Sequence, residues 1–229
     1  EADNPLGKDK RVREALELSL DRKAINDAVF EGRFVPSNQA ETPGSRYWNP
    51  ARPVPGRDVA KAKALLAAAG QPHPVFTLSV ANSPIAQQLG QIIQAMAGEA
   101  GFQIKLQSTE ATTMVANNTA GHYQAGLAIW SGRPDPDGNI SIWLACDGFL
   151  NWGKYCDPEF DKTLAEARSV TDPDARAKLY AKASDIYLDA RPALFLYHYK
   201  WLWGVSKKVG GFVPYPDGIV RLAGTKIAG

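Results

Sequence analysis

The sequence predicts an α/β fold, because strand-like and helix-like segments alternate through the middle of the 229-residue chain. In the strand-like segments, apolar side chains alternate with polar ones. In the helix-like segments they recur every three or four residues. Strand–helix–strand–helix–strand order at this spacing is typical of a sheet with right-handed crossovers that is flanked by helices. The predicted strands cover 75–81, 102–107 and 123–130.

Capping residues bound the predicted helices. An aspartate precedes several helical stretches, and its carboxylate can accept a hydrogen bond from a free N–H of the first turn. Glycines such as Gly32, Gly70 and Gly101 end others. In the helix 84–100, the side chains expected to face inward are Ile85, Leu89, Ile92, Ile93 and Met96. The predicted helices cover 10–20, 21–31, 59–69, 84–100, 110–119, 158–170 and 173–188.

Three further segments lack helical periodicity. Residues 34–57 contain five prolines, which predicts either a long ordered loop with a role of its own or a simple surface crossing. Residues 193–205 are rich in aromatic side chains and alternate enough to predict a long strand. Residues 210–229 hold glycine and proline turns, which predict little core of their own.

Composition limits the classes of partner. Hydrophobic residues make up 45% of the chain and charged residues 22%, as in a water-soluble globular protein. The formal net charge is +2, with basic and acidic residues mixed, so nothing favours binding to nucleic acid or to an anionic membrane. No apolar run approaches the roughly 18 residues of a membrane-spanning helix.

The most informative stretch follows the third predicted strand. Glycine, proline and aspartate there predict turns, arginine offers a planar fork for a carboxylate or phosphate, and tryptophan offers a flat apolar wall. The alternative is a plain surface turn. A calcium loop is rejected, because the glycine falls fourth and Cys146 twelfth where an acidic residue is needed. The candidate ligand-binding residues are Trp130, Ser131, Gly132, Arg133, Asp135, Asp137 and Asn139.

Catalytic and metal sites find little support. The three histidines, at 73, 122 and 198, are scattered, and no nucleophile–base pair, phosphate loop or dinucleotide fingerprint is present. We therefore predict no catalytic residues, no metal and no cofactor. Asp135 and Asp137 leave one enzymatic alternative, a small hydrolase that uses them as paired carboxylates. Cys146 and Cys156 form either a disulfide in an oxidising compartment or two unrelated thiols.

Several segments resemble the peptide/nickel class of solute-binding proteins, the dipeptide- and oligopeptide-binding family 5 that serves ABC importers. They span nearly the whole chain in the order found in that family. The segments are 8–16 (KDKRVREAL), 21–25 (DRKAI), 61–70 (KAKALLAAAG), 130–137 (WSGRPDPD) and 155–161 (YCDPEFD).

The resemblance implies a lobe of the type II periplasmic-binding-protein fold, with a mixed sheet flanked by helices. It covers the second half of the family's usual length. Residues 1–205 would be the second ligand-binding lobe, and residues 206–229 a tail that returns toward the missing first lobe. Apolar tail residues such as Phe212, Val213 and Ile219 would then be exposed or rearranged. Some members have a disulfide in the equivalent loop, which favours pairing of Cys146 with Cys156.

The resemblance also implies a function. Such a protein is periplasmic or otherwise extracytoplasmic, captures a peptide or related small polar solute by hinge closure, and delivers it to the membrane permease of an ABC importer. Peptide-binding members place an aspartate shortly after the tryptophan, where it meets the peptide amine. Here Arg133 follows instead, so either Arg133 faces an acidic or oxygen-rich group or Asp135 takes the amine. A non-transport binding domain on the same fold is a further alternative.

Overall fold

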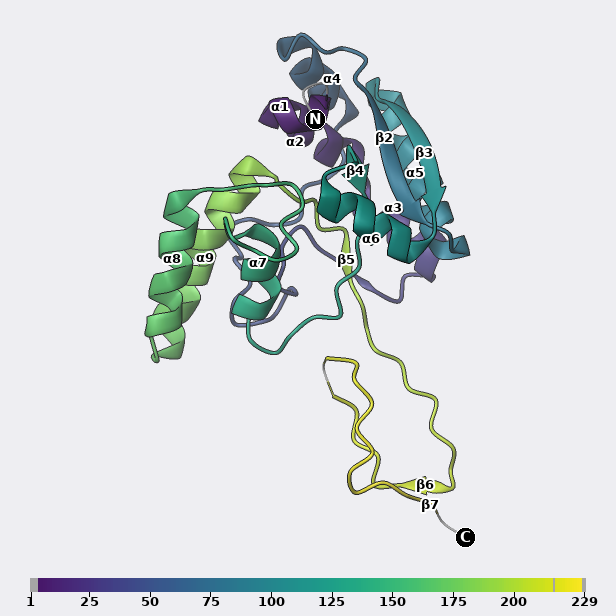
Figure 1. Ribbon diagram of the computed structural model, residues 1–229, viewed down its shortest axis with the longest axis vertical. Helices are drawn as coiled ribbons and strands as arrows, with labels where there is room; N and C mark the ends of the chain where they lie inside the picture. The colour runs from purple at the N-terminus through teal and green to yellow at the C-terminus, as the bar shows by residue number, and fades with distance from the viewer. Residues whose placement is uncertain (1–3, 216, 228–229) are drawn as a thin grey trace.

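Two clusters of buried apolar side chains organise the computed structural model of the protein, which describes residues 4–215 and 217–227. The first cluster joins a small parallel sheet to the N-terminal helices. The second lies among the helices between 137 and 190. Figure 1 shows the two groups as neighbouring bodies, with a C-terminal extension that leaves them.

The sheet contains three parallel strands in the order β3–β2–β4. Strands β2 (Val75–Ala81) and β3 (Gln103–Thr109) pair along their whole length, whereas β4 (Ala125–Gly126) pairs only with Leu78 and Ser79. Helices α5 (Pro84–Ala100) and α6 (Ala111–Ala120) connect successive strands. The predicted α/β class is confirmed. Antiparallel pairing occurs outside this sheet, between β1 (Val35–Pro36) and β5 (Tyr197–His198).

Side-chain caps begin the N-terminal helices, as predicted. Asp9, Asp21 and Asp58 accept hydrogen bonds from backbone N–H groups in the first turns of their helices, which satisfies donors that have no partner within the helix. Ser83 caps α5 in the same way. The helices in this group are α1 (Pro5–Lys8), α2 (Lys10–Ser19), α3 (Arg22–Phe30) and α4 (Val59–Ala68).

Helix α5 supplies much of the first core, with one correction to its predicted inner face. Leu89 and Ile93 are buried, and Ile92 and Met96 are partly buried against the cluster. Ile85, however, is 50% exposed. It lies in the first turn of α5, directly after β2 ends at Ala81, so the sheet does not extend beneath it.

Both long strand predictions were wrong in extent. The predicted strand 123–130 is reduced to β4, because the chain leaves the sheet after Leu127 donates its last hydrogen bond to Ser79. The predicted strand 193–205 is reduced to β5. Its aromatic side chains pack on Phe30 and Phe34 and on one another instead of alternating across a sheet, and its partner β1 ends at a proline.

The second cluster is built from three helices, α7 (Asp137–Leu144), α8 (Pro158–Ser169) and α9 (Pro173–Ala190). Asp157 and Asp172 cap α8 and α9 as predicted. The buried rings of Phe160, Tyr180 and Tyr187 fill the space between the helices. Helix α7 was not predicted, because its first residues, Asp-Gly-Asn, are typical of turns.

A buried ion-pair network joins the two groups of helices. Arg22 of α3 donates to Glu17 of α2 over 2.8 Å and to the backbone oxygen of Phe195 over 2.8 Å. Arg191, at the end of α9, donates to the second carboxylate oxygen of Glu17 over 2.8 Å. The Glu17 carboxylate therefore receives a guanidinium on each oxygen, which compensates for its burial.

The segment beyond Lys200 projects away from both clusters (Figure 1). It is held together by the antiparallel pair β6 (Val209–Gly210) and β7 (Lys226–Ile227) and by contact of Trp203 with Phe212. Of the three apolar tail residues named in the prediction, Val213 and Ile219 are exposed and Phe212 is half-buried. Residues 1–3 of the predicted lobe, and 216 and 228–229 of the predicted tail, lie outside the described residues. Among the described helices, none combines the length and apolar character needed to cross a bilayer.

Replacing Ile93 with alanine should lower the free energy of unfolding by about 2–5 kcal/mol, because it opens a cavity between α5 and the sheet. The matched change Ile85→Ala on the same helix should cost about 0.5 kcal/mol or less, since that side chain is half exposed. Urea denaturation of both variants measures the difference. Equal losses would contradict the assigned inner face of α5.

Candidate functional site

The loop from Trp130 to Asn139 is organised by one buried amide. The Asn139 Oδ1 atom accepts hydrogen bonds from the Trp130 indole N–H (3.2 Å) and from the Arg133 backbone N–H (2.7 Å). Its Nδ2 atom donates to the Arg133 carbonyl (2.9 Å) and to Glu41 Oε1 (3.2 Å). Both lone-pair directions and both amide hydrogens of Asn139 are therefore used. The buried side chain of Asn139 therefore fixes the positions of Trp130 and Arg133 in the loop.

Arg133 lies on the exposed side of the loop. Its guanidinium carbon lies 4.3 Å from the centre of the Trp130 ring, a cation–π contact. Its Nη1 atom donates to Ser131 Oγ (3.0 Å) and to the Gly132 carbonyl (2.6 Å). Gly132 adopts a positive φ of 78°, which directs its carbonyl into this arrangement. Ser131 and Arg133 are exposed, while Trp130 and Gly132 are half-buried.

The stem of Arg133 packs on the backbone of α7. A Cβ atom added to Gly138 would lie 2.9 Å from Arg133 Cγ, closer than real contacts allow, and a tight 3.0 Å from Arg133 Cβ. Only glycine at 138 leaves room for the arginine in this position. The sequence prediction treated this glycine as a turn former and missed its steric role.

The two aspartates of the loop bind arginines of the second helical group. Both oxygens of Asp135 accept from Arg176 of α9, over 2.8 and 2.9 Å, and this bidentate hydrogen bonding lowers the pKa of the Asp135 carboxyl. Asp137 accepts from Arg168 Nε of α8 over 2.9 Å. Asp135 and Asp137 therefore attach the loop to α8 and α9, and each charge is matched by an arginine.

Glu41 is a member of this site that the sequence prediction did not identify. It comes from the long proline-rich segment, and its side chain reaches Asn139. Burial, together with the nearby charge of Asp135, raises the pKa of the Glu41 carboxyl, and the hydrogen bond from Asn139 partly opposes that rise. Among the described residues, no lysine or arginine forms an ion pair with it. The only sequence signal was the length of the 34–57 loop.

Contacts among three tryptophans and a disulfide stabilise the segment that contains the loop and the residues after it. The Trp130 and Trp143 rings meet edge to face at 5.9 Å, and Trp143 and Trp152 do so at 5.4 Å. Cys146 and Cys156 form a disulfide that links the end of α7 to the start of α8. The structure therefore decides between the two predicted states of the cysteines, in favour of the pair.

Other polar side chains, outside the loop, serve structural roles. Ser83 caps α5, and Asn82 Oδ1 accepts a hydrogen bond from Gln87. His198 Nε2 lies 3.0 Å from the Gln39 carbonyl, and burial lowers the pKa of its imidazole. Across residues 4–215 and 217–227, no three His, Cys, Asp or Glu side chains converge in a geometry that would hold a metal.

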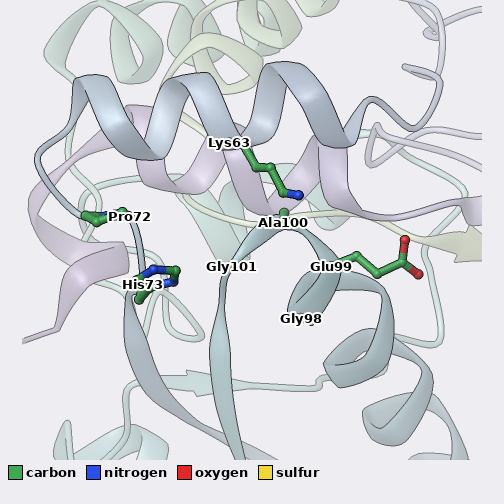
Figure 2. Close-up of a pocket in the computed structure, with 7 residues that line it drawn as sticks. All are labelled: Lys63, Pro72, His73, Gly98, Glu99, Ala100 and Gly101. Carbon is green, nitrogen blue, oxygen red and sulfur yellow. The ribbon is translucent and has the colours of Figure 1, made fainter.

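A shallow pocket of about 390 Å³ lies at the other end of the sheet (Figure 2). It is formed where α4, the segment before β2 and the end of α5 meet, and its lining includes Lys63, His73, Glu99 and Gly101. This is the amino end of the strands. Open α/β sheets bind ligands beyond the carboxyl ends of their strands, where the Trp130 loop lies, so the loop is the better candidate.

The family described as bacterial extracellular solute-binding proteins, family 5, middle part, matches residues 2–151. The chain belongs to this family. The resemblance found in the sequence motifs is therefore confirmed, and the family consists of solute-binding proteins, which sets the hydrolase alternative aside.

Individual relatives agree with this family 5 membership. The chain is 29% identical to a dipeptide-binding protein of Pseudomonas aeruginosa over 88% of its length and 39% of the relative's. It is 29% identical to heme-binding protein A of Haemophilus influenzae, over 96% of this chain and 42% of that one. The OppA structure of Burkholderia pseudomallei superposes with a TM-score of 0.85 at 26% identity, covering 99% of this chain and 47% of that one. The chain spans about two fifths of the length of the curated relatives it matches.

The disulfide should contribute about 2–4 kcal/mol to stability, because it closes a short loop in the unfolded chain. The double variant Cys146→Ser/Cys156→Ser should unfold at a correspondingly lower urea concentration. Adding a thiol reductant to the wild-type protein should lower its midpoint similarly, while leaving the double variant unchanged. Identical midpoints for all samples would show that the bridge does not stabilise the fold.

Stability should depend on pH through Glu41. Because folding raises the pKa of this carboxyl, the folded state holds its proton more tightly, and stability falls as pH rises from the ordinary value of 4.5 through the raised one. Glu41→Gln keeps an acceptor for Asn139 and removes the charge. The variant should therefore have a higher Tm than wild type near neutral pH and an equal Tm well below 4.5. A variant that is less stable at neutral pH would contradict this assignment.

Proposed function

We propose that this chain is a ligand-binding lobe of an extracytoplasmic, periplasmic receptor for an ABC importer. It captures a peptide or a related small polar solute by hinge closure against another lobe and delivers it to the membrane permease. The observation that carries the proposal is the combination of family 5 membership with an exposed loop of tryptophan and arginine beyond the end of the sheet. The relatives named for dipeptide and heme binding support a small solute as cargo.

The seven loop residues take different parts in the proposed binding site. Trp130, Ser131, Gly132 and Arg133 form the face that meets the solute, because Ser131 and Arg133 are exposed and are held in one arrangement. Asp135, Asp137 and Asn139 keep that face in place, since their polar groups are engaged by other side chains. Preorganisation of this kind reduces the entropy lost on binding.

The C-terminal tail supports a two-lobed receptor. Leu222 and Ile227 are each at least two-thirds exposed, and Val213 and Ile219 add to the apolar surface of the same segment. Monomeric proteins rarely leave so many apolar side chains uncovered. In this proposal the segment 206–229 packs on a first lobe that lies outside these 229 residues.

Binding is tested with the complete protein, including any residues that precede or follow this chain. Di- and tripeptides, glutathione and haem are titrated in thermal-shift and calorimetric experiments. At least one class should raise Tm, because a ligand at 100 times its Kd stabilises the folded state by about 2.7 kcal/mol. Failure of every compound to shift Tm or release heat would contradict the proposed solute class.

A further inference from the structure

The charges of the Trp130 loop do not balance within the loop itself. Each aspartate is matched by an arginine from a neighbouring helix, Asp135 by Arg176 and Asp137 by Arg168. Arg133 has no such partner: within the described part of the chain it forms no ion pair with a carboxylate. The exposed face of the loop therefore carries one uncompensated positive charge.

Arg133 is also held so that one edge of its guanidinium is free. The Trp130 ring lies against the face of the group, and Nη1 is engaged by Ser131 and Gly132. Among the described residues, none accepts a hydrogen bond from Nε or Nη2. These two atoms form the side-on edge of the fork, whose parallel N–H groups match the two oxygens of a carboxylate.

Contacts around Arg133 restrict the conformations that its side chain can adopt. A side chain at position 138 would clash with Cβ and Cγ of Arg133, so the glycine leaves room for the base of the arginine in this position. Since one face of the guanidinium contacts Trp130 and its Nη1 atom is hydrogen-bonded, less conformational freedom remains to be lost when an anion binds. This is the arrangement expected of a receptor group and not of a freely moving surface arginine.

Asp135 is poorly placed to receive an amine. Both of its oxygens accept from Arg176, and Oδ1 also accepts from the backbone N–H of Asp137 over 2.9 Å. Binding an ammonium group here would require breaking or sharing a bidentate pair that anchors the loop to α9. The structure therefore favours Arg133 over Asp135 as the charged group that meets the solute.

We propose that Arg133 is a specificity-determining residue that receives a carboxylate of the solute through Nε and Nη2, so that this loop selects for an anionic group. The inference rests on the proposed function and names the chemistry at one part of that site. A ligand amine, if present, is bound elsewhere in the site. Removing the ligand carboxylate and removing the Arg133 guanidinium should then each weaken binding to the same extent. Removing both together should weaken binding no more than removing either one.

The test is a double-mutant-type cycle in which one change is made in the protein and the other in the ligand. It uses the complete protein and three pairs of peptides, and the members of each pair differ by one carboxylate. The pairs are aspartyl-alanine with asparaginyl-alanine, alanyl-glutamate with alanyl-glutamine, and alanyl-alanine with its C-terminal amide. Calorimetry gives Kd for wild type, Arg133→Ala and Arg133→Lys. Lys63→Ala, which removes an exposed positive charge on α4, is the charge-matched control, and the Tm of each variant reports its folding.

In at least one pair, the amide should bind the wild type about ten-fold or more weakly than the carboxylate, as expected for a lost charge-assisted hydrogen bond. Arg133→Ala should bind the carboxylate peptide just as weakly and bind both members of that pair within about two-fold of each other. Arg133→Lys should retain part of the preference, because it keeps the charge and loses the fork. Lys63→Ala should match wild type.

The two proposals fail in different ways. If peptides bind but Arg133→Ala weakens both members of every pair equally, or neither member, the inference is overturned while the proposed function stands. That result would also arise if a carboxylate from the remainder of the protein paired with Arg133. If none of the six peptides binds to the wild type, peptide capture itself is contradicted, and the inference falls with it.

Discussion

The exposed face of the Trp130 loop depends on the side chain of Asn139. Its amide oxygen and nitrogen satisfy the Trp130 indole, both backbone groups of Arg133 and the Glu41 carboxylate at once. A buried amide that uses all its hydrogen-bonding capacity fixes its partners more firmly than any single surface contact. Two segments far apart in the sequence, around 41 and around 133, are joined through this one residue.

The remaining interactions are arranged around that centre. The loop aspartates bind arginines of α8 and α9, and the disulfide ties the segment just after α7 to the segment just before α8. The rings of Trp130, Trp143 and Trp152 pack edge to face on one another. Because Asp135 and Asp137 are paired with arginines of other helices, the Arg133 guanidinium is the one charged group of the loop without an ion-pair partner among the described residues. The same contacts that stabilise the loop therefore also set the sign of the charge it presents.

Local sequence chemistry predicted much of the fold. Capping aspartates and terminal glycines located most helices to within one or two residues, because these signals act within a single turn. The strands at 123–130 and 193–205 were overestimated, since their lengths depend on partners distant in sequence. For the site, residue types and the turn were predictable. The roles of Glu41 and Gly138 were not, because each depends on a contact made only in the folded chain.

The central claim is that a preformed loop offers Arg133 to an anionic group of the solute. A crystal structure of the complete protein with alanyl-glutamate bound tests it most directly. The account predicts that Arg133 stays stacked on Trp130, with Nε and Nη2 within hydrogen-bond distance of a ligand carboxylate and Asp135 still paired with Arg176. A ligand amine on Asp135, with Arg133 turned away from the ligand, would contradict it.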